Sequence, residues 1–179
     1  HPDMHLLAGI EANTGALGHG LPLACGMALG ERMKGSDARI FVVMGDGELP
    51  EGSNWEGAAL AAHHGLDHII VVVDCNGMQI SGTTAQVMDM ESITGKFESF
   101  GWGATTIDGN DMAQVVGSLD RMPLRKGSPS VIVARTVKAK GISLVEGTVA
   151  SHYWKPSEAE LAAAIEEAAA RITELEERV

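Results

Sequence analysis

The chain has 179 residues, of which 45% are hydrophobic and 21% are charged, a composition typical of globular proteins and not of disordered ones. A chain of this length forms one domain that buries about 70% of its unfolded surface. The 24 acidic residues outnumber the 13 Lys and Arg residues, and the net charge of −11 disfavours nucleic acid and anionic membranes as partners. We therefore predict a single domain over residues 1–179 that binds neither.

The cysteine count and the first residues bear on the setting of the protein. Cys25 and Cys75 are too few for a disulfide framework and lack the spacing of a Cys/His metal site, which fits a reducing cytoplasm. No apolar stretch reaches about 18 residues, and the start has no signal-peptide pattern. Because the chain starts His1-Pro2-Asp3-Met4, we expect that an N-terminal part of the domain is missing.

Apolar stretches alternate with helical patterns along most of the chain. This alternation predicts an α/β fold in which a mostly parallel sheet has helices on both faces. The expected strands are short, continuous Val/Ile-rich stretches, which are typical of strands buried on both faces. The expected helices are 17–33, 52–64, 90–100 and 111–122, and the expected strands are 38–44, 68–73, 104–107 and 130–136.

The last forty residues differ from this alternation. Residues 137–156 have no convincing periodicity, and loops of that length in compact domains are usually functional or disordered. Ser157 and Glu160 have the spacing of a capping box, which indicates that a helix begins there. Apolar residues then recur every three or four positions, which predicts a C-terminal amphipathic helix with one buried stripe: Leu161, Ile165, Ala168, Ile172, Leu175 and Val179.

Polar residues follow the first two predicted strands. Gly45-Asp46-Gly47-Glu48 comes after the first strand, and Asp74-Cys75-Asn76-Gly77-Met78 begins where the second one ends. Parallel sheets bind ligands at the carboxyl ends of their strands. A carboxylate from Asp46, an amide oxygen from Asn76 and a turn carbonyl are the donors that Mg²⁺ or Ca²⁺ takes, with water and ligand phosphates completing the shell. Gly-Asp-Gly and Asn-Gly are also common tight turns, so a purely structural interpretation stays open.

Taken together, four motifs resemble those of a known enzyme family. Gly-Asp-Gly followed by Asn, with 29 residues between Asp46 and Asn76, resembles the signature of thiamine-diphosphate-dependent enzymes. NTGALGHG over 13–20 resembles the TTGPLGQG segment of transketolases, KFESFGW over 96–102 their KFEAYGW, and DGND over 108–111 their DGHD. The resemblance covers only the diphosphate-binding half of a transketolase. It is greatest to the N-terminal subunit of a split, two-gene transketolase.

The resemblance implies a thiamine-diphosphate-binding fold and a set of ligand positions. Asp46 and Asn76 correspond to side-chain metal ligands, and Met78 corresponds to the residue whose carbonyl completes them. The glycine-rich stretch before the first helix also suits a diphosphate, because helix N-terminal amides attract anions. The implied cofactor-binding residues are Gly15, Leu17, Gly47, Asn76 and His152.

The resemblance also implies catalytic groups and a missing partner. His1 and His152 correspond to histidines near the reactive centre, and Glu51 and Glu56 to acidic residues of a proton-linking network between paired active sites. Glu51 and Glu56 are equally typical of acids at a helix start, and His152 of a solvated loop. The glutamate that activates the aminopyrimidine ring belongs, in this family, to a second domain that this chain lacks.

These implications define a function. We expect a subunit that binds thiamine diphosphate and Mg²⁺, for which Ca²⁺ or Mn²⁺ can substitute, and transfers a two-carbon ketol unit between sugars or sugar phosphates. Its expected partner is a C-terminal subunit with the pyrimidine-binding domain, in a hetero-oligomer built on a dimer, without which this chain is inactive. A deoxyxylulose-phosphate synthase, a 2-oxo-acid dehydrogenase component and a non-catalytic fragment remain alternatives, although KFESFGW and DGND favour transketolase.

Departures from the family pattern limit what can be expected of the substrate. Cys75 stands where many members have Asp or Asn, and Tyr153-Trp154 follow His152 where small residues are common. Aromatic bulk beside a substrate channel would select an unusual sugar.

Overall fold

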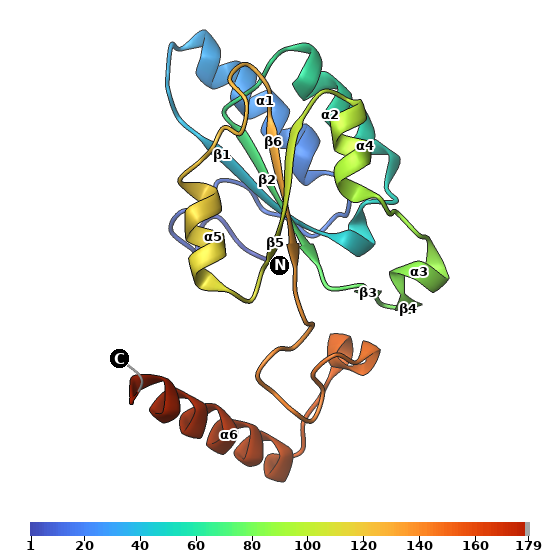
Figure 1. The fold of residues 1–179 in the computed structure, drawn as a ribbon, viewed down its shortest axis with the longest axis vertical. Helices are drawn as coiled ribbons and strands as arrows, with labels where there is room; N and C mark the ends of the chain where they lie inside the picture. Colours follow the sequence, from blue (N-terminus) through green and yellow to red (C-terminus); the bar gives the residue numbers. More distant parts are fainter. Residues whose placement is uncertain (178–179) are drawn as a thin grey trace.

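The computed structural model describes residues 1–177, in which four parallel strands form the main sheet (Figure 1). The order is β1 (Ile40–Gly45), β2 (Ile69–Cys75), β6 (Ser130–Arg135) and β5 (Gly103–Asp108). The register pairs Gly45 with Asp74 and Cys75 with Arg135. Three strands therefore end side by side at the same edge of the sheet.

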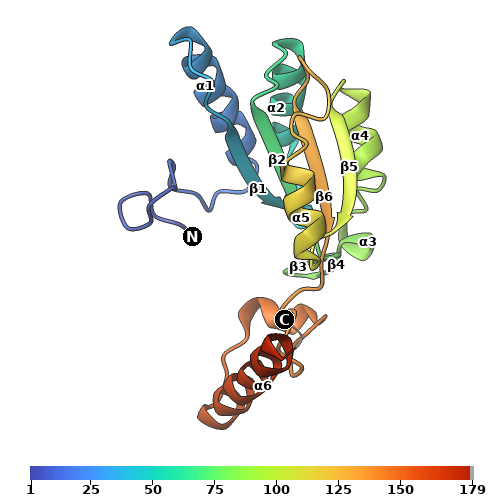
Figure 2. The same ribbon diagram turned by 60° about the vertical axis from the view of Figure 1, so that its left-hand side comes forward.

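Helices cover both faces of this sheet, as predicted. On one face lie α1 (Gly20–Met33), α2 (Gly52–His63) and α4 (Ile93–Ser99), which pack with inward residues such as Val71 and Val133 into the larger core cluster. On the other face lies α5 (Met112–Leu119), over a smaller cluster around Ile70 and Ile132 (Figure 2). The central strands β2 and β6 are almost fully buried, which explains their Val/Ile-rich sequences.

The larger core is completed by aromatic residues and small helix residues. Phe97 of α4 packs edge-on against Trp102 at 5.1 Å between ring centroids. The Trp102 indole donates a hydrogen bond of 2.9 Å to the carbonyl of Ala58, so α2 is tied to the strand that follows α4. Ala58 and Ala61 are fully buried, and their small side chains let α2 lie close to the sheet.

Two predicted boundaries shift because of glycines with positive φ. The first helix begins at Gly20 and not at Leu17, because Gly18 has φ +80° and a Cβ on it would lie 2.5 Å from Ser53 Oγ. The predicted turn over 74–77 is wrong in its first half, because Asp74 and Cys75 still pair within β2. The chain turns at Asn76-Gly77, where Gly77 has φ +74°.

Short elements that the sequence did not predict follow this turn. They are β3 (Met78–Gln79), β4 (Gly82–Thr83) and α3 (Thr84–Val87). The strands β3 and β4 form an antiparallel pair, which holds the chain beside the end of the main sheet.

The C-terminal segment lies beyond the carboxyl end of the sheet (Figure 1). It contains the 3-10 helix η2 (Val149–Tyr153) and α6 (Glu158–Glu176), which begins with the predicted capping box of Ser157 and Glu160. The predicted buried stripe is wrong, because the stripe residues within the described chain are exposed and Ala164 is the buried residue of α6 among them. The periodicity identifies an apolar face but not what covers it. Val179 lies outside the described residues.

Within residues 1–177, no helix combines the length and apolar character needed to span a membrane.

Candidate functional site

The predicted polar residues after β1 and β2 meet at the end of the sheet. Asp46 opens the 3-10 helix η1 (Asp46–Glu48) and is 3% exposed. Its Oδ1 accepts a hydrogen bond from the backbone N–H of Gly47 at 2.9 Å, and its Oδ2 accepts one from Gly77 at 2.8 Å. The thiol of Cys75 also donates to Oδ2, at 3.7 Å. The turn after β2 therefore closes over the carboxylate that follows β1.

Burial shapes the electrostatics of this carboxylate. Desolvation raises the pKa of Asp46, although the N–H groups of Gly77 and Gly47 act in the opposite direction. Burial and the neighbouring Asp46 also raise the pKa of the Cys75 thiol, to about 11. A cation beside Asp46 would offset the desolvation of its charged form. The site is therefore electrostatically suited to a metal ion.

Asn76 and Met78 add oxygen atoms next to Asp46. The side-chain oxygen of Asn76 accepts a hydrogen bond of 3.0 Å from the N–H of Met78. A Cβ added to Gly47 would lie 3.5 Å from the Met78 carbonyl oxygen and 2.7 Å from Cβ of Gln79. Only glycine fits there, and its bare backbone is open to close approach.

The donor set is one of oxygens. Within the described chain, no group of three or more His, Cys, Asp and Glu side chains could hold a metal ion. An ion here would be bound by a carboxylate, an amide oxygen and a carbonyl, with water and phosphate completing its shell, which is the usual arrangement of Mg²⁺. The buried Oε1 of Gln79 also has no hydrogen-bond partner within residues 1–177, so an unsatisfied polar atom lies beside Gly47. These features fit a diphosphate–Mg²⁺ group.

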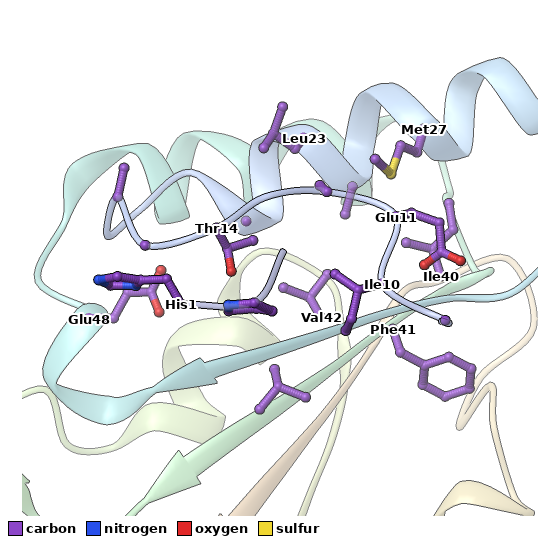
Figure 3. A pocket seen from close by; sticks show the side chains of 18 of the residues that line it. His1, Ile10, Glu11, Thr14, Leu23, Met27, Ile40, Phe41, Val42 and Glu48 are labelled. Carbon is purple, nitrogen blue, oxygen red and sulfur yellow. The ribbon is translucent and has the colours of Figure 1, made fainter. Parts of the chain in front are cut away.

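A second group of predicted residues lines a cavity of about 870 Å³ between the N-terminal segment, α1 and β1. His1, Gly15 and Leu17 contribute to it, together with Glu48 of η1. Figure 3 shows His1 and Glu48 toward one end of this cavity and Met27 toward the other. The His1 ring lies so close to Gly15 that a Cβ there would be 2.6 Å from Nδ1. The structure thus brings His1 to the glycine-rich segment.

Two contacts join this cavity to the Asp46 cluster. The backbone N–H of Gly18 donates to Oε1 of Glu48 at 2.8 Å, and the hydroxyl of Ser53 donates to the Gly18 carbonyl at 2.7 Å. The glycine-rich segment is therefore fixed to η1 and to the start of α2. Glu48 and Ser53 were not predicted as site residues, although Glu48 lies within the polar stretch after β1.

The remaining predicted residues are less closely joined to this cluster. Glu51 is exposed at the start of α2 next to Gly18, and Glu56 is exposed one turn further along α2. His152 is exposed in η2, where its ring packs edge-on against Tyr153 at 4.7 Å, and η2 lies against β3. Within residues 1–177, none of the three side chains forms a hydrogen bond or ion pair with Asp46.

The end of β6 carries two further polar residues that the sequence did not single out. Arg135 and Thr136 contact Cys75 and Asp74 of the neighbouring strand. The strand-end rule that pointed to Asp46 and Asn76 applies equally to the strand predicted over 130–136. Extending it to that strand would have found both residues.

Comparison with known proteins agrees with this geometry. The family described as "Transketolase, thiamine diphosphate binding domain" matches residues 1–169. One named subunit of the apulose-4-phosphate transketolase of Actinobacillus succinogenes is 42% identical over 167 residues, which are 93% of this chain and 60% of that protein. The 6-deoxy-6-sulfo-D-fructose transketolase subunit of a Clostridium species is 40% identical, over 93% of this chain and 61% of that protein.

Solved structures show the same similarity. The transketolase of Campylobacter jejuni superposes with a TM-score of 0.85 and 32% sequence identity, over 94% of this chain and 27% of that chain. The parallel sheet with helices on both faces is therefore the arrangement of a solved transketolase. The chain spans about 60% of the length of the curated relatives named above.

Proposed function

Because the chain belongs to the transketolase family through its thiamine-diphosphate-binding domain, we propose that it binds thiamine diphosphate with Mg²⁺. We further propose that residues 1–179 act as one subunit of a transketolase, transferring a two-carbon ketol unit from a ketose to an aldose. The observation that carries this proposal is the convergence of Asp46, Gly47 and the 76–78 turn, where the backbone N–H of Gly77 lies 2.8 Å from Oδ2 of Asp46.

Each side of this cluster has a proposed role toward the cofactor. Asp46 and Asn76 donate side-chain oxygens to the metal ion, Met78 donates its carbonyl, and Ca²⁺ or Mn²⁺ can replace Mg²⁺. Gly47 leaves space for the diphosphate, as the 2.7 Å approach of Gln79 to its missing Cβ supports. Gly15 and Leu17 contact the cofactor from the cavity side, and His152 reaches the diphosphate from η2.

The reaction also needs proton transfer beside the cofactor. When bound, thiamine diphosphate supplies a thiazolium carbon nucleophile and an electron sink for the two-carbon unit. His1 lies beside Gly15 and donates or accepts protons at the substrate oxygens, for which a histidine pKa is suited. His152 does the same from the opposite side once η2 closes. Glu51 and Glu56 face the partner and link the protons of paired sites.

The partner and the substrate class follow from the same proposal. Two relatives are named as subunits of an apulose-4-phosphate transketolase, which supports a second subunit carrying the pyrimidine-binding domain. We propose a hetero-oligomer built on a dimer, working in the cytoplasm. The relatives are named for apulose-4-phosphate and 6-deoxy-6-sulfo-D-fructose, so the proposed substrates are ketoses with or without an anionic group.

The test uses the full chain together with its pyrimidine-domain subunit. Binding of thiamine diphosphate is measured by calorimetry with and without Mg²⁺, and ketol transfer is measured with a panel of ketose donors and aldose acceptors. We expect Mg²⁺-dependent binding, a hetero-oligomer in sedimentation, and turnover only with both subunits.

Each contrary result has its own meaning. Full turnover by this chain alone as a monomer would overturn the split-subunit proposal. Cofactor binding without ketol transfer by the assembled subunits would favour another thiamine-diphosphate reaction or a non-catalytic role. Absence of Mg²⁺-dependent cofactor binding in the assembled complex would overturn the proposal altogether.

A further inference from the structure

The carboxyl end of β6 supplies no predicted metal ligand, yet it lies against the strand that leads to one. Arg135 is in register with Cys75, and the backbone N–H of Thr136 donates to the Cys75 carbonyl at 3.2 Å. The two β6 residues therefore flank the last residues of β2, from which the chain continues into the Asn76 turn.

Arg135 reaches Asp46 through the Cys75 thiol. Nη1 of Arg135 donates to Sγ of Cys75 at 3.1 Å, and the same thiol donates to Oδ2 of Asp46 at 3.7 Å. Nη2 of Arg135 forms an ion pair with Oε1 of Glu91 at 2.5 Å. Because Glu91 holds the other arm of the guanidinium, the direction in which Nη1 points is fixed. Arg135 also brings a positive charge toward the buried Asp46 carboxylate.

Thr136 reaches Asn76 through Asp74. The hydroxyl of Thr136 donates to Oδ1 of Asp74, and Oδ2 of Asp74 accepts a hydrogen bond from the Asn76 side-chain nitrogen at 3.4 Å. An amide whose nitrogen is held by a carboxylate presents its oxygen on the other side. In Asn76 that oxygen faces the N–H of Met78, at 3.0 Å. Asp74 and Thr136 therefore determine which Asn76 atom is offered to the turn over 76–78.

These two chains of contacts have the same form. Each leads from a β6 residue through a β2 residue to one of the predicted side-chain ligands. Groups that orient metal ligands from behind are as important to a site as the ligands themselves, and their removal costs about 10- to 100-fold in metal affinity.

From these contacts we propose that Arg135 and Thr136 are positioning residues of the metal site. Arg135 orients the Asp46 carboxylate through Cys75, and Thr136 orients the Asn76 amide through Asp74. This inference rests on the proposed function, because it assumes that Asp46 and Asn76 bind the ion. It adds that the third strand of the sheet sets the affinity of a site to which it gives no ligand.

The test compares variants that remove each contact with variants that keep it. Thr136→Val removes the hydroxyl at nearly constant shape, and Thr136→Ser retains it. Arg135→Gln removes the charge, whereas Arg135→Lys keeps the charge but not the two-armed geometry. The full chain with its partner subunit is titrated with MgCl₂ at a fixed thiamine diphosphate concentration, and the half-saturating Mg²⁺ concentration is measured by calorimetry.

We expect Thr136→Val and Arg135→Gln each to raise that concentration by about 10- to 100-fold. Thr136→Ser should restore wild-type behaviour, and Arg135→Lys should restore part of it. Thr106→Val on β5 and Lys126→Gln, both at exposed positions, are matched controls that should change nothing. Thermal midpoints measured without Mg²⁺ should stay within a few degrees of the wild type, which separates a weakened site from a damaged fold.

Two results would overturn the inference, and they can be told apart. Wild-type Mg²⁺ affinity in both Thr136→Val and Arg135→Gln, together with loss of binding in Asp46→Asn, would refute the positioning role and leave the proposed function intact. An equal loss in Thr136→Val and Thr136→Ser would likewise refute it, since the hydroxyl would not be the cause. Lack of Mg²⁺-dependent cofactor binding in the wild type would overturn both proposals.

Discussion

The carboxyl end of the main sheet and the segment over 137–176 both carry predicted site residues, but they hold them differently. At the sheet end, Asp46 is buried and accepts hydrogen bonds from two backbone N–H groups and one thiol. In the later segment, His152 is exposed and contacts the ring of the adjacent Tyr153. Backbone pairing positions the first residue, whereas the second depends on how a loop lies.

This difference teaches where a binding site is complete within one chain. The oxygen donors around Asp46 come from neighbouring parallel strands, whose register leaves little freedom. The apolar face of α6 and the exposed His152 have no such framework within the described residues. We therefore expect the sheet end to bind the metal ion by its own geometry, and the later segment to acquire its function on closure or assembly.

The largest expected effect comes from removing the charge at the sheet end. Asp46→Asn should weaken Mg²⁺-dependent binding of thiamine diphosphate by at least about 100-fold, because the site loses its anionic ligand. The fold should persist, since burial raises the pKa of Asp46 and the substitution removes a desolvated charge. Calorimetry gives the affinity and thermal unfolding gives the stability.

Asp37→Asn is the matched control, because Asp37 is exposed and precedes β1 at the other end of the sheet. It should leave both measurements unchanged. Equal Mg²⁺ affinity in Asp46→Asn and the wild type would show that the sheet end is not the metal site.

A smaller effect is expected from the loop residue. His152→Ala should lower ketol transfer in the assembled enzyme by about 100-fold, within the range for a lost proton-transfer group, and leave Mg²⁺ affinity almost unchanged. Hydrogen exchange across 137–156 should slow when thiamine diphosphate, Mg²⁺ and the partner are added, because closure of η2 orders the loop.

His64→Ala is the control for this substitution, since His64 is exposed at the end of α2. Wild-type turnover of His152→Ala with unchanged exchange in the loop would mean that His152 is a solvated residue without a part in the reaction.

How much could be predicted from the sequence follows from the same contrast. The strands were predictable because continuous Val/Ile stretches such as that of β2 are typical of a parallel sheet, and the strand-end rule then pointed to Asp46 and Asn76. The start of α1 was missed by three residues, because the pattern does not reveal that Gly18 takes φ +80° against Ser53.

Other features were beyond the sequence because they depend on contacts distant along the chain. The pairing of Arg135 with Cys75 joins residues 60 positions apart, and no local pattern indicates it. The stripe of α6 was assigned to the interior from its spacing alone, but spacing does not show whether another element lies opposite. The roles of Glu51, Glu56 and His152 stay predictions for a similar reason, since they depend on a partner or a closure.

The start of α6 gives a local effect with a pH dependence. Hydrogen bonds from the Ser157 backbone and hydroxyl lower the pKa of Glu160 below its ordinary value of 4.5. Because this pKa is lowered in the folded state, the stabilisation is complete above the ordinary pKa and is lost as pH falls through the lowered one. Ser157→Ala should raise the pKa of Glu160 toward 4.5, measured by its NMR titration.

The same substitution removes the cap of α6, for which the usual cost is about 1 kcal/mol. Amide exchange in the first turn should accelerate accordingly, whereas Ser157→Thr, which keeps a hydroxyl, should retain both the cap and the lowered pKa. An unchanged Glu160 titration in Ser157→Ala would contradict the capping box.

The smallest effect is expected on the exposed stripe of α6, where Ile165 is 60% exposed. Ile165→Ala should change the free energy of unfolding of this chain by less than about 0.5 kcal/mol, since little apolar surface is buried there. The same substitution at Ile132, which is 1% exposed in β6, should cost about 2–5 kcal/mol, because it leaves a cavity in the core. Urea unfolding of both variants measures this contrast directly. A loss above about 2 kcal/mol in Ile165→Ala would mean that α6 packs against the sheet in solution, as its periodicity predicted, and that the C-terminal segment is as well anchored as the sheet end.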